Sequence, residues 1–198
     1  MKYLTAMLLF LLVLANQGCR KTENVSAVRD APVYESPRLA LLSFFEGIRD
    51  CDRSKAISAV IDSTVISRYV NAFIATVQSM NNFAKADREF FGDGGFSADF
   101  AQRIVDDVDK TEIEMISDTS AQWPQNPEAP HMLSKTKQGW RIDPNKEDFK
   151  DFLLFGTRVF RDNETMYNAL TAGIRNGEIK TRDESRDEMA RLKERFKL

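Results

Sequence analysis

The sequence has few of the side chains on which metal and redox chemistry depend. Among its 198 residues there are two cysteines and one histidine. It contains no HExxH motif, no paired redox cysteines and no nucleophile elbow. The two thiols together with His131 cannot supply a recognisable metal site. We therefore expect neither a metal nor another cofactor, and we assign no catalytic residue.

An excess of charge of one sign is also missing. The 28 Lys and Arg residues stand against 30 Asp and Glu residues, which gives a net charge of -2. This balance provides no overall attraction to nucleic acid or to an anionic membrane surface. The run from Arg182 to Lys197 mixes both signs, which is typical of a solvated helix face. We expect no nucleic-acid partner.

Long hydrophobic runs are limited to the first residues. Lys2 precedes a largely apolar run of 12 residues from Leu4 to Ala15, in which Thr5 is the one polar residue. This run is too short to cross a bilayer of about 30 Å as a helix. Its layout is that of an export signal, and we predict a signal peptide over residues 1–18. Without it, 27 basic residues stand against 30 acidic ones, a net charge of -3.

Two cleavage sites are compatible with this signal. Val13-Leu14-Ala15 suits a general signal peptidase. Gly18-Cys19 resembles the end of a bacterial lipoprotein signal, although Asn16-Gln17 departs from that family's pattern of an apolar and a small residue. The resemblance implies that the Cys19 thiol is lipidated and anchors an exported protein of the bacterial cell envelope. The alternative is a soluble periplasmic or secreted protein in which Cys19 is free to pair with Cys51.

The domain organisation follows from this signal. Residues 19–36 are mostly polar and predict a flexible tether. Residues 37–198 predict a single domain. They carry most of the large apolar side chains that offset the entropy of ordering a chain.

The first half of this domain has helical periodicity. Ser36-Pro37 supplies an N-cap and a proline at the first helical position. A second short helix, capped by Ser54, would complete a helical hairpin. Residues 64–91 form the longest periodic segment. Its heptad spacing extends over about two heptads, too few for a coiled coil, so it predicts a core-facing helix. Gly92–Gly95 predicts a turn, and residues 96–108 a further helix.

The second half changes character near Thr111. Alternating polar and apolar residues predict strands up to Trp123, at His131–Lys135 and at Gly139–Asp143, joined as a small antiparallel sheet over about residues 111–143. Beyond it the chain is helical again, with Thr181 and Glu184 forming a capping box. We predict an α+β fold, in which a helical N-terminal half packs on the small antiparallel sheet and C-terminal helices are added.

The order of these elements, with the segment Leu133-x-Lys135-x-x-x-Gly139-Trp140-Arg141-Ile142-Asp143, resembles the nuclear transport factor 2-like (SnoaL-like) superfamily. The resemblance implies that residues 37–143 form the family domain, with a cone-shaped pocket, and that residues 144–198 are a helical extension. Residues 64–109 are nearly all helical where the family places strands. A helical domain with a small sheet insert therefore stays open as an alternative.

Enzymes of that superfamily use an Asp or His in an apolar pocket that tunes its pKa. The candidates here are His131, Asp118, Glu114 and Asp143. Each also has a structural interpretation. His131 enters a strand, Asp118 and Asp143 sit beside turns that they can cap, and Glu114 alternates with apolar neighbours and faces water.

We therefore predict an exported, lipid-anchored, non-enzymatic envelope protein that binds a small ligand or acts as an accessory domain. Tyr69, Trp123, His131 and Trp140 are candidates to line a small apolar pocket, with core packing as the alternative for both Trp residues. The expected partners are the membrane through Cys19 and a small apolar ligand or an envelope protein. One alternative is a pocket enzyme of the isomerase or hydrolase type, with His131 or Asp118 as general base. Another is an interaction module or homodimer that associates through the sheet or the terminal helix.

Overall fold

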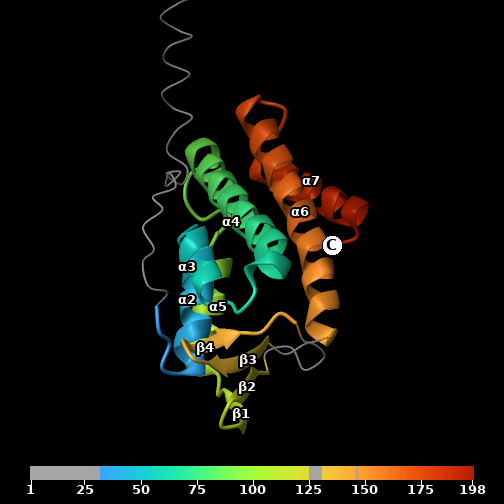
Figure 1. The fold of residues 1–198 in the computed structure, drawn as a ribbon. Coiled ribbons are helices and arrows are strands. Elements are labelled where there is room, and N and C mark those ends of the chain that lie inside the picture. Colours follow the sequence, from blue (N-terminus) through green and yellow to red (C-terminus); the bar gives the residue numbers. More distant parts are fainter. Residues whose placement is uncertain (1–31, 125–130, 146) are drawn as a thin grey trace, which may run out of the picture. The chain divides into compact units, whose positions relative to one another are not determined.

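The computed structural model describes residues 32–124, 131–145 and 147–198. They belong to one unit, residues 31–198. The predicted signal peptide, Cys19 and most of the predicted tether lie outside the described residues. The fold is α+β, as predicted, and its elements in chain order (Figure 1) are α2 (Pro37–Arg49), α3 (Arg53–Ser58), α4 (Ser63–Phe91), α5 (Phe100–Lys110), β1 (Glu114–Ser117), β2 (Ser120–Trp123), β3 (His131–Thr136), β4 (Gly139–Ile142), α6 (Glu147–Arg175) and α7 (Arg182–Phe196).

The helical hairpin at the start of the domain is built from α2 and α3. The Ser36 Oγ accepts a hydrogen bond from the amide of Leu39 at 3.3 Å, which confirms the predicted cap of α2. The cap of α3 is Asp52 and not Ser54, because the Asp52 carboxylate accepts from the amide of Lys55 at 2.9 Å. Helix α3 therefore begins two residues earlier than a cap at Ser54 would give.

Gly47 allows the two helices of the hairpin to approach closely. A Cβ placed at this position would lie 2.5 Å from the backbone nitrogen of Ala56 in α3. Glycine normally weakens a helix interior relative to alanine. Here the cost is offset by a contact between α2 and α3 that no larger residue permits.

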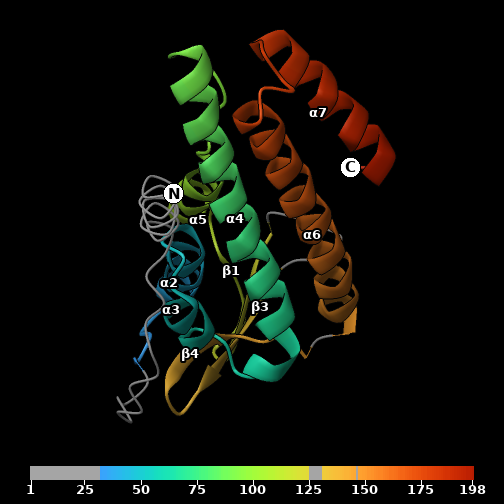
Figure 2. The ribbon, with the colours of Figure 1, turned by 90° about the horizontal axis from the view of Figure 1, so that it is seen from above.

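Helices α4 and α6, of 29 residues each, lie side by side and run in the same direction (Figure 2). The Thr76 hydroxyl donates to the Phe160 carbonyl at 2.6 Å, and further along both helices the rings of Phe83 and Tyr167 are 5.7 Å apart. Each helix is about 43 Å long at 1.5 Å per residue. The predicted core-facing stripe of α4 is confirmed, since its members are all buried: Ile66, Val70, Phe73, Val77 and Met80.

This helix pair links two hydrophobic clusters. The larger cluster combines α2, α3, α5, the sheet and the first half of α4, with Leu153 from α6. The second combines the later parts of α4 and α6 with α7, and its buried members are Met80, Phe83, Ala86, Met166, Tyr167, Leu170, Ile174, Ile179 and Leu192. The C-terminal helices therefore extend the core along α4.

The sheet is an antiparallel meander in the order β1-β2-β3-β4. Ala121, Leu133 and Ile142 lie opposite one another on three neighbouring strands, and all three are buried. Gly139 has a φ of 87° in the turn between β3 and β4, as the predicted turn requires. Strand β1 is exposed along its whole length and forms one edge of the sheet.

The packed domain begins earlier than predicted. Tyr34 is buried, and its carbonyl accepts from the amide of Trp140 at 2.8 Å. The Arg141 guanidinium stacks over the Tyr34 ring at 4.7 Å and donates to the Pro32 carbonyl at 2.6 Å. Residues 32–36, assigned from sequence to the tether, are therefore part of the domain. Its boundary lies at or before Pro32.

Candidate functional site

Trp123 and His131, two of the predicted pocket residues, face each other on β2 and β3 inside the core. They are register partners, and their rings are 5.3 Å apart. Phe45 of α2 lies 5.4 Å from Trp123 and 5.6 Å from His131, while Phe152 of α6 lies 5.7 Å from His131. Aromatic rings from both helices therefore cover this end of the sheet.

Tyr69 belongs to an aromatic group between α4 and α6. Its ring lies 5.9 Å from Phe73, 6.1 Å from Phe152 and 5.4 Å from Phe160. Gly156 packs directly on it, since a Cβ at Gly156 would lie 2.8 Å from Tyr69 Cε2. Through Phe152, this group continues the row of rings that begins at Trp123.

Trp140 lies at the turn end of β4. It is buried, and Lys135 on the neighbouring strand places its ammonium 6.0 Å from the ring. Tyr69, Trp123, His131 and Trp140 are thus all placed in the core, and the grooves described below are lined by other residues.

Burial also shifts the pKa values of two of these side chains, His131 and Tyr69. It lowers the pKa of His131 to about 4, so the imidazole is neutral at pH 7. It raises the pKa of the Tyr69 hydroxyl above its usual range. Both side chains are therefore uncharged members of the core at neutral pH.

Two of the carboxylate candidates lie on the surface and away from His131. Glu114 and Asp118 are exposed. The turn that carries Asp118 lies beside Lys135, whose amide donates to the Thr119 carbonyl. Lys135 is four residues along β3 from His131, or about 13 Å at 3.3 Å per residue.

Asp143 has the turn-capping role that its sequence neighbours suggest. Its two carboxylate oxygens accept from the Ser134 hydroxyl at 3.0 Å and from the Asn145 amide at 3.1 Å.

A buried ion pair between Asp87 of α4 and Arg182 of α7 organises the glycine-rich turn. The closest guanidinium-to-carboxylate distance is 3.3 Å, and Asp87 also accepts from the amide of Phe96 at 3.1 Å. Arg182 in addition donates to the carbonyl of Gly92 at 2.7 Å. A Cβ at Gly95 would lie 1.5 Å from the Asp87 carboxylate. The predicted helix over 96–108 therefore starts only at Phe100, because the chain up to Phe96 is held by this pair.

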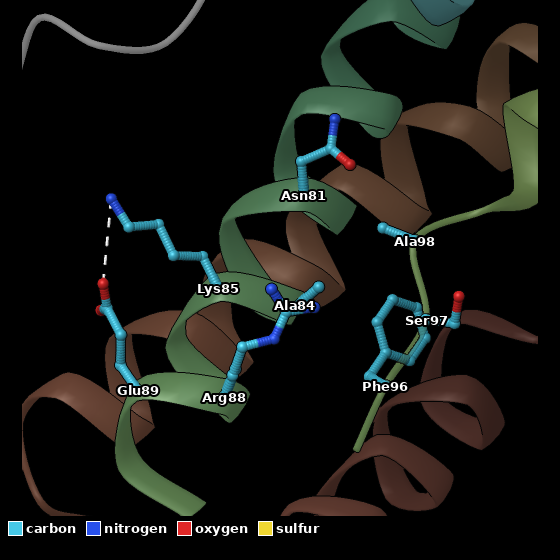
Figure 3. A pocket seen from close by; sticks show the side chains of 8 residues that line it. All are labelled: Asn81, Ala84, Lys85, Arg88, Glu89, Phe96, Ser97 and Ala98. Carbon is cyan, nitrogen blue, oxygen red and sulfur yellow. Dashed lines mark ion pairs between the residues drawn. The ribbon is translucent and has the colours of Figure 1, made fainter. Parts of the chain in front are cut away.

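A groove of about 550 Å³ lies between the outer face of α4 and the segment 96–98 (Figure 3). Its charged side chains are already paired. Lys85 reaches Glu89 at 3.8 Å, and Arg88 reaches Asp93 at 3.8 Å. These exposed pairs leave little unbalanced charge for a ligand.

A second groove of about 550 Å³ lies between the first halves of α4 and α6. It is called the α4–α6 groove below, and its lining residues are Thr64, Arg68, Lys150, Leu153, Leu154, Thr157, Arg158, Arg161 and Asp162. It combines two leucine side chains with four cations and one carboxylate. Among the described acidic side chains, which do not include those of residues 147 and 148, none lies within 4.0 Å of any of the four cations as an ion pair.

Two smaller grooves are explained by local structure. The one beside α7 is acidic, but its carboxylates have partners: Glu188 pairs with Arg191, and Glu184 accepts from the Lys180 amide at 2.7 Å. Of the predicted capping box, the bond from the Glu184 amide to the Thr181 hydroxyl is formed, whereas the Glu184 carboxylate accepts from Lys180 and not from Thr181. The other lies on the surface of α5 and mixes both charge signs.

Within residues 32–124, 131–145 and 147–198, no group of three or more acidic, histidine or cysteine side chains is placed to hold a metal ion. The same residues include no helix with the length and apolarity needed to cross a membrane. Cys51 is half-buried just beyond the end of α2, with a φ of 57°.

Comparison of the chain with protein-family models, with curated proteins and with solved structures finds no match. The resemblance to the nuclear transport factor 2-like superfamily therefore rests on the quoted residues alone and stays a prediction.

Proposed function

We propose that this chain is an exported, lipid-anchored, non-enzymatic accessory protein of the bacterial cell envelope, whose domain works at or near a membrane surface. The observation that carries this proposal is the Gly18-Cys19 dipeptide, which follows an apolar run of signal length after the two polar residues Asn16 and Gln17. A diacyl-type anchor at Cys19 would provide the two-chain attachment that stable membrane association needs.

The position of the domain boundary supports this proposal. Only residues 20–31 separate Cys19 from Pro32, where the packed domain has begun. A fully extended chain of this length reaches about 45 Å at most. An anchor at Cys19 would therefore hold the domain within about one α4 length of the bilayer.

The arrangement of the core supports an external rather than an internal binding surface. The sheet end at Trp123 and His131 is covered by rings, and the unbalanced charge lies in the α4–α6 groove on the outside. The pocket-enzyme alternative would need His131 or Asp118 beside a cavity, and neither lines a groove described above. No specific observation favours that alternative.

The test is metabolic labelling with a radioactive fatty acid in a bacterium that expresses the chain. The wild type and the control Cys51→Ser are expected to carry label and to fractionate with membranes. Cys19→Ser is expected to lose both. Equal labelling of Cys19→Ser and wild type, or an unlabelled wild type, would overturn the anchor.

A further inference from the structure

We propose that the α4–α6 groove is a docking surface for a bilayer that contains anionic phospholipid. The inference deepens the proposed function, since it identifies the face that an anchored domain would turn toward its membrane. It rests on the charge of the groove, on the apolar side chains beside it and on the short connection to Cys19.

The charge of the groove is opposite to that of the whole chain. Arg68 from α4 and Lys150, Arg158 and Arg161 from α6 line it, against the single carboxylate of Asp162. Further acidic residues lie close to the groove in the sequence: α6 also carries Glu147, Asp148 and Asp151, and Asp62 caps α4 beside Thr64. Basic residues close to an anionic bilayer each add to binding, so four of them in one groove complement lipid phosphates.

Apolar side chains project beside these cations. Leu154 and Phe155 on α6 are 64% and 58% exposed, and Leu154 is itself part of the groove. The Arg158 guanidinium lies 5.6 Å from the centre of the Phe155 ring. Leucine and phenylalanine flanked by arginine are the side chains that enter the boundary between headgroups and acyl chains.

A bilayer accounts for these features better than a small ligand does. A molecule inside the groove could cover Leu154, but Phe155 is not among the groove's lining residues and would stay exposed. An extended surface contacts both. An anchor at Cys19 would also raise the effective concentration of the bilayer near the domain, so a weak surface would be sufficient.

The experiment uses the full chain with Cys19→Ser, so that no lipid anchor contributes. Its binding is measured by co-sedimentation with vesicles of phosphatidylcholine alone and with vesicles that contain about 30% phosphatidylglycerol. The apolar N-terminal run is present in every variant, so the readout is the difference between the two lipids. That difference is expected to be large at low salt and to shrink as salt is added.

The groove variant Arg158→Glu/Arg161→Glu is expected to lower the partition coefficient on phosphatidylglycerol vesicles about tenfold or more. The matched control Lys137→Glu/Lys180→Glu makes the same change in net charge on exposed turns elsewhere. It is expected to stay within about twofold of the parent. Leu154→Ser is expected to weaken the binding that persists at high salt.

Equal losses for the groove variant and its control would overturn the proposal, as would equal binding to both lipids. Inorganic phosphate that competes more strongly than sodium chloride of equal ionic strength would instead indicate a site for a free anion, and would also overturn it. Because Cys19 is absent from all these chains, a failure here is separate from a failure of the fatty-acid labelling.

Discussion

At the scale of single residues, His131 is the side chain whose surroundings have the clearest measurable effect. It is the only histidine in the chain, and burial lowers its pKa from 6.5 to about 4. In the unfolded chain the imidazole takes up a proton near pH 6.5, whereas in the folded chain it stays neutral until about pH 4. The unfolded state therefore binds more protons in this window, and stability falls as the pH is lowered through it.

We predict that the free energy of unfolding falls by about 2 kcal/mol between about pH 7.5 and about pH 5, and that His131→Phe removes most of this fall. The ring of the variant can pack on Phe45 and Trp123, so its stability at pH 7.5 should change by about 1 kcal/mol or less. Urea unfolding at both pH values measures the effect. An identical pH dependence in the two proteins would show that other groups cause the loss.

At the scale of elements, the attachment of α7 depends on the ion pair between Asp87 and Arg182. Asp87 is nearly fully buried, so removal of Arg182 leaves a carboxylate with only the Phe96 amide to stabilise it. We predict that Arg182→Ala destabilises the domain by about 2–4 kcal/mol. Hydrogen exchange should show lost protection in α7 and at Phe96.

The control for this prediction lies on the same helix. Arg186 forms an exposed pair with Asp183 at 3.1 Å, and Arg186→Ala should cost about 0.5 kcal/mol or less. If Arg182→Ala costs no more than this control, the buried pair does not hold α7 in place.

This pair also shows which parts of the fold can be predicted from sequence. The caps at Ser36 and Thr181 and the buried stripe of α4 depend on neighbours within one or two helical turns, and the pattern indicates them directly. Asp87 and Arg182 are 95 residues apart, so no local pattern joins them. The signal in the sequence that could have suggested the contact was Asp87 itself, an aspartate shortly before a glycine-rich turn, because such a carboxylate needs a partner when it is buried.

The same limit applies to the candidate sites. The aromatic candidates were recognisable as large apolar residues, but sequence alone could not tell a pocket lining from a packed core. The α4–α6 groove brings Arg68 beside residues of α6 more than 80 positions later. The net charge of -2 does not reveal this local excess of positive charge, because it sums the charges over all faces of the molecule.

At the scale of the whole molecule, the N-terminal boundary of the domain depends on contacts between the segment around Tyr34 and strand β4, about 100 residues later in the chain. The segment that contains Tyr34 is held by β4, through the Trp140 amide and the Arg141 guanidinium. Arg141 is itself buried, which lowers its pKa from the usual value. Its hydrogen bonds to the carbonyls of Pro32 and Trp140 compensate for that burial.

We predict that limited trypsin digestion of the Cys19→Ser chain first removes residues up to Arg29 and leaves a fragment from Asp30 that unfolds at the same urea concentration as the uncut chain. Arg141→Gln should loosen the Tyr34 segment, because it removes the stacking and the bond to Pro32 but leaves the bond to the Trp140 amide, so that the cut at Arg29 becomes faster. The control Arg158→Gln alters an exposed arginine and should leave the rate of that cut unchanged. Mass spectrometry identifies the new N-termini and their rates of appearance. A first cut inside residues 32–198 of the parent chain, or an unchanged rate of cutting in Arg141→Gln, would contradict this boundary.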